Sequence, residues 1–166
     1  MEYAILFLPL IGSIIGYFGK SITKLFSEIT TSLFVSISAI LSIAVFWNGI
    51  EKNNYNNYII FEWISSGDFI ANWSINIDPL SSVMLVVVTF VSALVHIYSI
   101  GYMSHDPHKP RFMSYLSLFT FSMLALVVSD NFLQLFFGWE GVGLCSYLLI
   151  GFWYKKESAN NAAIKA

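Results

Sequence analysis

One stretch decides the class of fold: PLSSVMLVVVTFVSALVHIYSIGYMS, residues 79–104, which contains no Asp, Glu, Lys or Arg. A helix needs about 20 apolar residues to cross the hydrocarbon core of a bilayer, at about 1.5 Å per residue. The stretch lacks the polar stripe of a helix that lies on the surface of a soluble protein. It therefore predicts a transmembrane helix.

Further runs of the same character lie on both sides of this stretch. The charged residues cluster between the runs, at 20–28, 51–78, 105–111 and 155–157. The sequence therefore predicts an all-α polytopic membrane protein with five transmembrane helices and the start of a sixth, in a single membrane domain over residues 1–166. The expected helices span about 3–19, 29–50, 79–104, 112–129 and 131–154, and the sixth begins near residue 159.

Composition supports the same class of protein. Hydrophobic residues make up 57% of the chain and charged residues 11%, whereas soluble domains carry about 25% charged residues. So few charges exclude an ordinary cytosolic enzyme, a disordered chain and a nucleic-acid binder. Cys145 is the only cysteine, which excludes a secreted module built on disulfides.

The first run, 3–19, has a competing interpretation as a signal peptide. It is the shortest of the five and carries Pro9, Gly12 and Gly16. A signal peptide begins with a basic segment and ends at a cleavage site with small residues. Neither feature is present, so we expect a membrane crossing here.

The basic residues predict the orientation of the bundle. Cytoplasmic loops of membrane proteins carry an excess of Lys and Arg. With five crossings, the loops on one side hold six basic residues and the opposite side holds only Lys52. The six are Lys20, Lys24, Lys109, Arg111, Lys155 and Lys156. We therefore expect the N-terminus outside and the loop at 155–157 inside.

The long outer loop, 51–78, is expected to contain a β-hairpin. Apolar and polar residues alternate over 71–77, and a second apolar segment, 59–64, lies on the other side of a Ser-Ser-Gly-Asp turn at 65–68. Alternation on both sides of a glycine-containing turn is typical of a hairpin.

Two acidic positions are interpreted as helix starts. Asp78 comes directly before Pro79, and an Asp cap followed by proline at the first helical position is a strong helix-start signal. The pair Asp130-Asn131 is expected to start the next-to-last helix in the same way.

Glu140 is the only carboxylate deep inside an expected span. A charged residue at this depth costs roughly 2.5–3.5 kcal/mol on insertion scales. The carboxyl is therefore either protonated or ionised against a buried cation, and its proton affinity depends on its neighbours. This makes it a candidate proton relay; the alternative is a neutral, hydrogen-bonded structural residue. Three nearby glycines, Gly138, Gly141 and Gly143, predict that this face lies inside the bundle.

His96 is the other titratable group within a span. Its imidazole can pass protons between water and a buried site, or it can simply hydrogen-bond a neighbouring helix. His105, Asp106 and His108 resemble a metal cluster, but they lie in a proline-flanked loop without helical spacing or a cysteine ligand, so we expect no metal there.

Residues 138–152, GWEGVGLCSYLLIGF, resemble the L-subunit family of proton-pumping NADH:quinone oxidoreductase, respiratory complex I, whose mitochondrial equivalent is NADH dehydrogenase subunit 5. Four shorter stretches also match, in the same order along the chain as in the family. They are DPLS at 78–81, HIYS at 96–99, SDN at 129–131 and AAIKA at 162–166. Family members are several times longer, so the resemblance covers only their N-terminal part.

The resemblance implies a proton-translocating, antiporter-like subunit of an enzyme complex. In the family, the glutamate matching Glu140 pairs with a lysine on a later helix, beyond these 166 residues, and shifts in that pair drive proton transfer. Lys165 matches a family lysine at the inner start of the sixth helix, near the proton entrance. NADH, FMN, iron–sulfur clusters and quinone belong to partner subunits, and no cofactor or metal is expected in this chain.

The resemblance also implies partners and a location. The partners would be the lipid bilayer and other membrane subunits of complex I, especially neighbouring antiporter-like subunits. The location would be a bacterial inner membrane, or alternatively the mitochondrial inner membrane. Two other functions stay open: the A subunit of a multisubunit sodium/proton antiporter, and a mainly structural piece for assembly. Without the later lysine, the 166 residues are not expected to complete a proton path.

Overall fold

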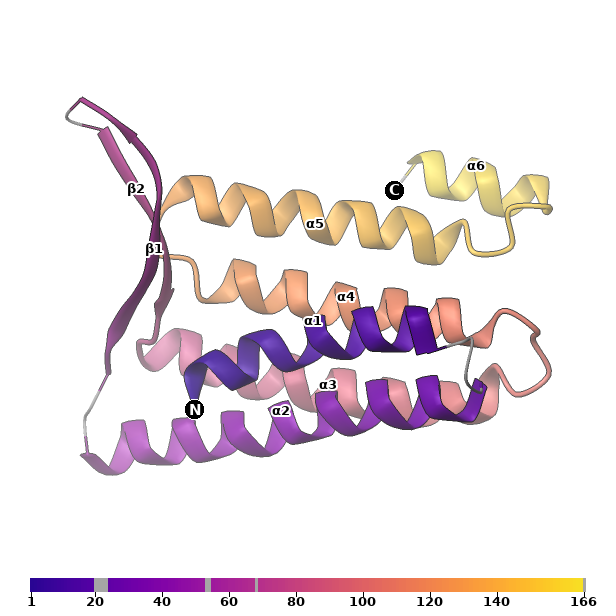
Figure 1. Ribbon diagram of the computed structural model, residues 1–166, viewed down its shortest axis with the longest axis horizontal. Helices are drawn as coiled ribbons and strands as arrows, with labels where there is room; N and C mark the ends of the chain where they lie inside the picture. Colours follow the sequence, from indigo (N-terminus) through magenta and orange to yellow (C-terminus); the bar gives the residue numbers. More distant parts are fainter. Residues whose placement is uncertain (20–23, 53–54, 68, 166) are drawn as a thin grey trace.

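Six helices and one β-hairpin make up the computed structural model, which describes residues 1–19, 24–52, 55–67 and 69–165. In chain order the elements are α1 (Glu2–Phe18), α2 (Lys24–Lys52), β1 (Asn57–Ser66), β2 (Phe69–Asn76), α3 (Pro79–Tyr102), α4 (Lys109–Val127), α5 (Phe132–Ile150) and α6 (Glu157–Lys165). The long helices lie side by side, the hairpin crosses one end of them, and α6 folds back beside the end of α5 (Figure 1). The predicted helical architecture with a hairpin before the third helix is confirmed.

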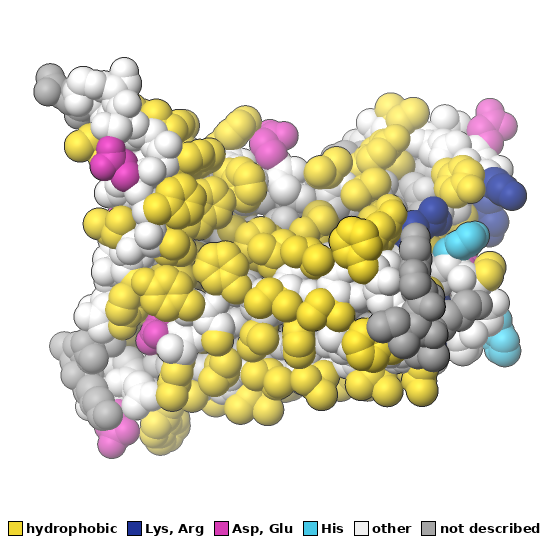
Figure 2. Space-filling model, viewed as in Figure 1, with side chains coloured by type: hydrophobic (Ala, Val, Ile, Leu, Met, Phe, Trp, Pro, Cys, Tyr) yellow, Lys and Arg dark blue, Asp and Glu magenta, His cyan; other side chains and the backbone are white. Residues whose placement is uncertain are grey.

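Four of the described helices, α2 to α5, are long and apolar enough to cross a membrane. On the face shown in Figure 2, hydrophobic side chains extend along the length of the bundle, while Lys, Arg and His side chains gather at the end opposite the hairpin. α1 is apolar but has 17 residues, about 25 Å of helix against a hydrocarbon core about 30 Å thick.

Several predicted helix boundaries were wrong. α2 begins at Lys24 rather than near residue 29, and α4 begins at Lys109 rather than near residue 112. In both places the predicted boundary stopped at charged residues, and the helix continues through them. α5 ends at Ile150, before the predicted residue 154, because Gly151 and the residues after it form a turn.

Neighbouring helices satisfy the backbone of α1. The ring nitrogen of Pro9 has no hydrogen to donate, so the carbonyl oxygen of Ile5 has no helical partner. The hydroxyl of Ser38 in α2 donates to this oxygen at 2.7 Å. The hydroxyl of Ser117 in α4 donates to the carbonyl oxygen of Pro9 at 2.9 Å. Satisfying backbone groups in this way allows a proline-containing helix to pack in an apolar environment.

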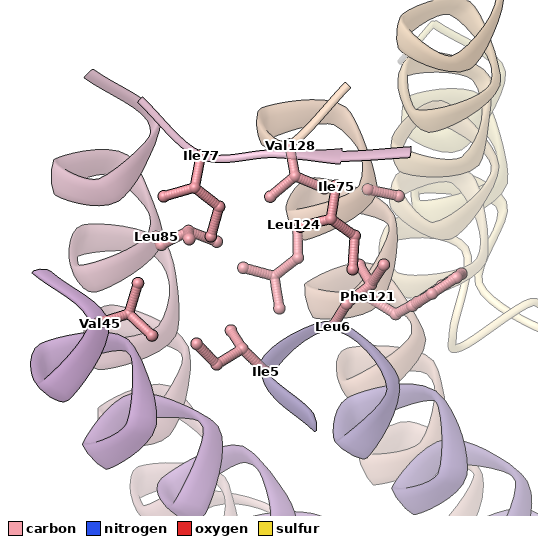
Figure 3. Close-up of a cluster of buried hydrophobic side chains, with 10 residues drawn as sticks. Ile5, Leu6, Val45, Ile75, Ile77, Leu85, Phe121, Leu124 and Val128 are labelled. Atoms are coloured by element: carbon pink, nitrogen blue, oxygen red, sulfur yellow. The ribbon is translucent and has the colours of Figure 1, made fainter. Parts of the chain in front are cut away.

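The hairpin holds the helix ends together. β1 and β2 pair in antiparallel fashion, and the turn places Gly67 at a φ of 60°, where glycine is favoured. The backbone nitrogen of Asn76 in β2 donates to the carbonyl oxygen of Val128, directly after α4, at 2.9 Å. Beneath β2 lies a buried hydrophobic core drawn from four helices and the hairpin (Figure 3). Its labelled members are Ile5, Leu6, Val45, Ile75, Ile77, Leu85, Phe121, Leu124 and Val128.

The two predicted helix starts turned out differently. The carboxylate of Asp78 accepts from the backbone nitrogen of Ser81 at 2.6 Å, and the Ser81 hydroxyl accepts from the Asp78 backbone nitrogen at 2.8 Å. These hydrogen bonds lower the pKa of Asp78 below its usual value. At the second position the cap is Asn131, which accepts from the backbone nitrogen of Gln134. Asp130 instead accepts from the amide of Asn57 in β1 at 2.7 Å.

Candidate functional site

α5, which carries Glu140, is fixed to the hairpin at its start. The side chain of Gln134 is buried and makes two hydrogen bonds to the backbone of Ser74 in β2, donating at 2.7 Å and accepting at 3.0 Å. The ring of Phe137 packs edge-on against Trp73, with centroids 4.8 Å apart. The first two turns of α5 are therefore held by both polar and aromatic contacts.

Two glycines allow α5 to pack closely against α4. A Cβ atom on Gly138 would lie 2.7 Å from the backbone of Leu126, and one on Gly141 would lie 2.8 Å from the Ser122 hydroxyl. A Cβ atom on Gly143 would meet nothing within 4 Å in the described part of the chain. The glycines therefore serve two different faces of α5 rather than one.

Glu140 lies one residue from the centre of the 19-residue helix α5, on the face away from α4. Its side chain is exposed, as are those of Phe136 and Tyr147 on the same stripe of the helix. Among the four membrane-length helices, α5 is the least buried. In its apolar 18-residue segment 17% of the residues are buried, compared with 56% in that of α4. No described helix covers this face, so its location inside the bundle stays a prediction.

His96 in α3 is completely buried. Its Nδ1 lies 2.8 Å from the carbonyl oxygen of Ser92 one turn earlier. A carbonyl only accepts, so Nδ1 carries the proton and Nε2 presents a lone pair. Nε2 is buried and has no hydrogen-bond partner in the described part of the chain. One turn away, the hydroxyls of Ser92 and Thr120 hydrogen-bond each other between α3 and α4.

The structure does not bring the three predicted site residues together. α4 packs against both α3 and α5, so His96 and Glu140 lie on two different helices that each contact α4. Lys165 is exposed in the last turn of α6. α6 runs back along α5 (Figure 1), and a Cβ atom on Gly151 would lie 3.2 Å from that of Ala163. Within the described residues no cation lies within ion-pair distance of Glu140.

Sequence reasoning missed a buried ion pair. Lys109 Nζ lies 2.6 Å from a carboxylate oxygen of Glu28, and the two side chains are only 8% and 6% exposed. The pair joins the first turn of α4 to the start of α2, at the end of the bundle opposite the hairpin. The sequence did contain a signal, namely one carboxylate and one ammonium near the starts of two helices that begin at the same end of the bundle, but both were assigned to loops.

In the loop at 105–108, the carboxylate of Asp106 makes two hydrogen bonds. One oxygen of Asp106 accepts from the backbone nitrogen of His108 at 2.7 Å, and the other accepts from the indole of Trp153 at 3.0 Å. Slight burial opposes ionisation of Asp106, but these bonds outweigh it, so its pKa lies below the usual value. The described residues contain no group of three metal-binding side chains.

The fold and the site define a class: a polytopic membrane protein with one carboxylate in the middle of an apolar helix. Residues 63–113 match the family described as NADH-ubiquinone oxidoreductase (complex I), chain 5 N-terminus. Residues 129–166 match the family described as NADH:quinone oxidoreductase/Mrp antiporter, transmembrane. These two matches cover α3, α5 and α6 and include Glu140.

Individual relatives agree with the family matches. The chain is 56% identical over 163 residues to NADH-quinone oxidoreductase subunit L of Rickettsia conorii. This match covers 98% of this chain and 25% of that protein. It is 55% identical over 167 residues to NADH-ubiquinone oxidoreductase chain 5 of Arabidopsis thaliana, covering all of this chain and 25% of that protein. The chain belongs to the family of complex I subunit L and chain 5, and spans about a quarter of the length of these relatives.

Proposed function

We propose that the chain is the N-terminal part of a proton-translocating subunit of NADH:quinone oxidoreductase, with Glu140 as the titrating group. The observation that carries the proposal is the position of this carboxylate, at the centre of α5 on a face that no described helix covers. The relatives named above are subunits of NADH oxidoreductases. NADH oxidation and quinone reduction themselves fall to other subunits.

The proposed chemistry is the gain and loss of one proton at the Glu140 carboxylate. With a cation beside it, the ionised form is favoured and the proton leaves; when the cation moves away in an apolar environment, the neutral form is favoured and a proton binds. We propose that this cation is a lysine outside these 166 residues. The contacts of Gln134 and Gly138 support this function because they hold α5 fixed while its partner moves.

The test is Glu140→Gln in the assembled enzyme that contains this chain, with NADH-driven proton uptake measured in vesicles. We expect proton pumping to fall at least about ten-fold, since an amide keeps the shape but cannot titrate. Glu62→Gln, an exposed carboxylate on β1, is the matched control and should leave pumping unchanged. Normal pumping with Glu140→Gln would contradict the assignment, and loss of the assembled complex would favour the structural alternative.

His96 and Lys165 are proposed as additional relay groups. The unpartnered, buried Nε2 of His96 supports its role, because a free lone pair can take a proton. Lys165 is supported by its exposure at the end of α6, which returns along α5. His96→Asn and Lys165→Gln should each reduce the pumping rate in the same assay. An unchanged rate would leave His96 as a packing residue, or Lys165 as a surface residue.

The second family description also names the Mrp antiporter, which favours a sodium/proton antiporter subunit as the alternative function. The two functions differ in their driving force. Sodium-dependent proton transport by vesicles lacking NADH-oxidising subunits would support the antiporter. Copurification with those subunits would support the oxidoreductase.

We further propose five crossings in a bacterial inner membrane, or alternatively a mitochondrial one, with the N-terminus outside. Support comes from α1, which packs beside α2 and α4, and from the exposed Lys155 and Lys156 at the end opposite the hairpin. In a Cys145→Ala background, an impermeant maleimide added to intact cells should label Ser66→Cys and not Lys155→Cys. The reverse labelling pattern would overturn the orientation.

A further inference from the structure

Two adjoining hollows lie at the end of the bundle opposite the hairpin. One, of about 190 Å³, lies between the start of α4, the end of α5 and α6. The other, of about 180 Å³, lies against the turn that links α5 to α6. Both are lined by Arg111, Phe152 and Tyr154. We call the two together the basic-end pocket; Lys155 and Lys156 complete its wall.

Arg111 is held in place with part of its hydrogen-bonding capacity unused. One terminal nitrogen donates to the carbonyl oxygen of Phe152 at 3.2 Å. The guanidinium carbon lies 4.6 Å from the centre of the Phe152 ring and 5.7 Å from that of Tyr154. Its Nε is buried and has no partner in the described part of the chain. The terminal N–H groups that make no hydrogen bond within the described residues are well suited to bind a phosphate oxygen.

The two lysines add charge that the neighbouring carboxylates do not neutralise. Among the described residues, neither lysine lies within ion-pair distance of a carboxylate. Apart from Glu28, which pairs with Lys109, the described carboxylates at this end are Asp106 and Glu157, and both oxygens of Asp106 accept hydrogen bonds. The ammonium of Lys156 lies 5.1 Å from the centre of the Trp153 ring. Three cations therefore face two carboxylates, which leaves an excess of one positive charge.

We propose that the basic-end pocket binds the phosphate head group of an anionic phospholipid. Basic pockets at the ends of transmembrane helices bind such head groups, and aromatic rings lie preferentially at the same depth. The cations supply the charge that a phosphodiester requires, while the exposed rings of Trp153 and Tyr154 supply apolar surface for the glycerol and upper acyl chain. This surface distinguishes a lipid from a free phosphate ion. The proposal does not depend on proton transport by Glu140.

The test measures lipid binding by native mass spectrometry of the 166-residue chain in a mild detergent, with phosphatidylglycerol or phosphatidylcholine added. The wild-type chain should bind phosphatidylglycerol more tightly. Lys155→Gln/Lys156→Gln should weaken that binding on the order of 30-fold, because each basic residue near the membrane surface contributes about five-fold. Both lysines are exposed, so this variant should fold normally. Arg111→Lys, which keeps the charge but loses the planar fork, should weaken binding less than Arg111→Gln.

Lys52→Gln is the control, since it removes one lysine from the other end of α2, at the hairpin end of the bundle. It should leave phosphatidylglycerol binding unchanged. Equal affinity for the two lipids, or an equal loss with Lys52→Gln, would overturn the proposal. Displacement of the bound lipid by millimolar inorganic phosphate would assign the pocket to a free anion and would also overturn it.

Discussion

Lys109→Gln is expected to lower the free energy of unfolding by about 3–5 kcal/mol, because it leaves the carboxylate of Glu28 buried without a partner. The Glu28 side chain is only 6% exposed, and Lys109 is its one ion-pair partner among the described residues. An unpaired buried carboxylate must either take up a proton or draw water into the α2–α4 contact. Both outcomes loosen the end of the bundle opposite the hairpin. The measurement is the midpoint of unfolding in a dodecyl sulfate titration, followed by helical circular dichroism.

The double variant Glu28→Gln/Lys109→Gln isolates the buried charge as the cause. It removes both ions while keeping hydrogen-bonding side chains, so it should recover most of the loss. Lys156→Gln removes one exposed ammonium from the same end of the bundle and should change the midpoint little. If Lys109→Gln and Lys156→Gln behaved alike, the ion pair would not stabilise the contact between α2 and α4.

The ion pair also shows why the presence of apolar helices could be predicted better than their ends. Runs without charge identify helices directly, because lipid excludes isolated ions. The same rule placed Glu28 and Lys109 in loops, since a sequence does not show that two charges 81 positions apart neutralise each other. Once paired they can lie inside helices, and α2 and α4 therefore begin earlier than predicted.

In the candidate site too, the local features could be predicted from the sequence, whereas the contacts between distant residues could not. The isolation of Glu140 in an apolar run was visible in the sequence, and so was the helix that carries it. Which glycines face α4 depends on how α5 is rotated about its own axis. That rotation is set by Gln134, whose hydrogen bonds to Ser74 link residues 60 positions apart. A glutamine near the start of a helix usually lies in solvent, so the local sequence did not indicate that Gln134 would be buried and bonded to Ser74.

Gly138→Ala is expected to destabilise the protein by about 1–3 kcal/mol, as overpacking does in close-packed cores. The new Cβ atom would lie 2.7 Å from both the Cα atom and the backbone nitrogen of Leu126. These are backbone atoms of α4, so no side-chain rotation relieves the contact and the two helices must separate. Glu140 lies half a turn further along α5 and would move with the helix. The measurement is again the unfolding midpoint, together with proton pumping in the assembled enzyme.

Gly143→Ala, on the same helix, is expected to have no such destabilising effect. A Cβ atom there meets nothing within 4 Å among the described residues, and alanine is favoured over glycine in a helix by about 1 kcal/mol. In the isolated 166-residue chain this variant should therefore be neutral or slightly stabilising. If it were stabilising there but impaired the assembled enzyme, a further segment would pack against the Glu140 face of α5. If Gly138→Ala and Gly143→Ala destabilised the isolated chain equally, α5 would not contact α4 through the face that contains Gly138.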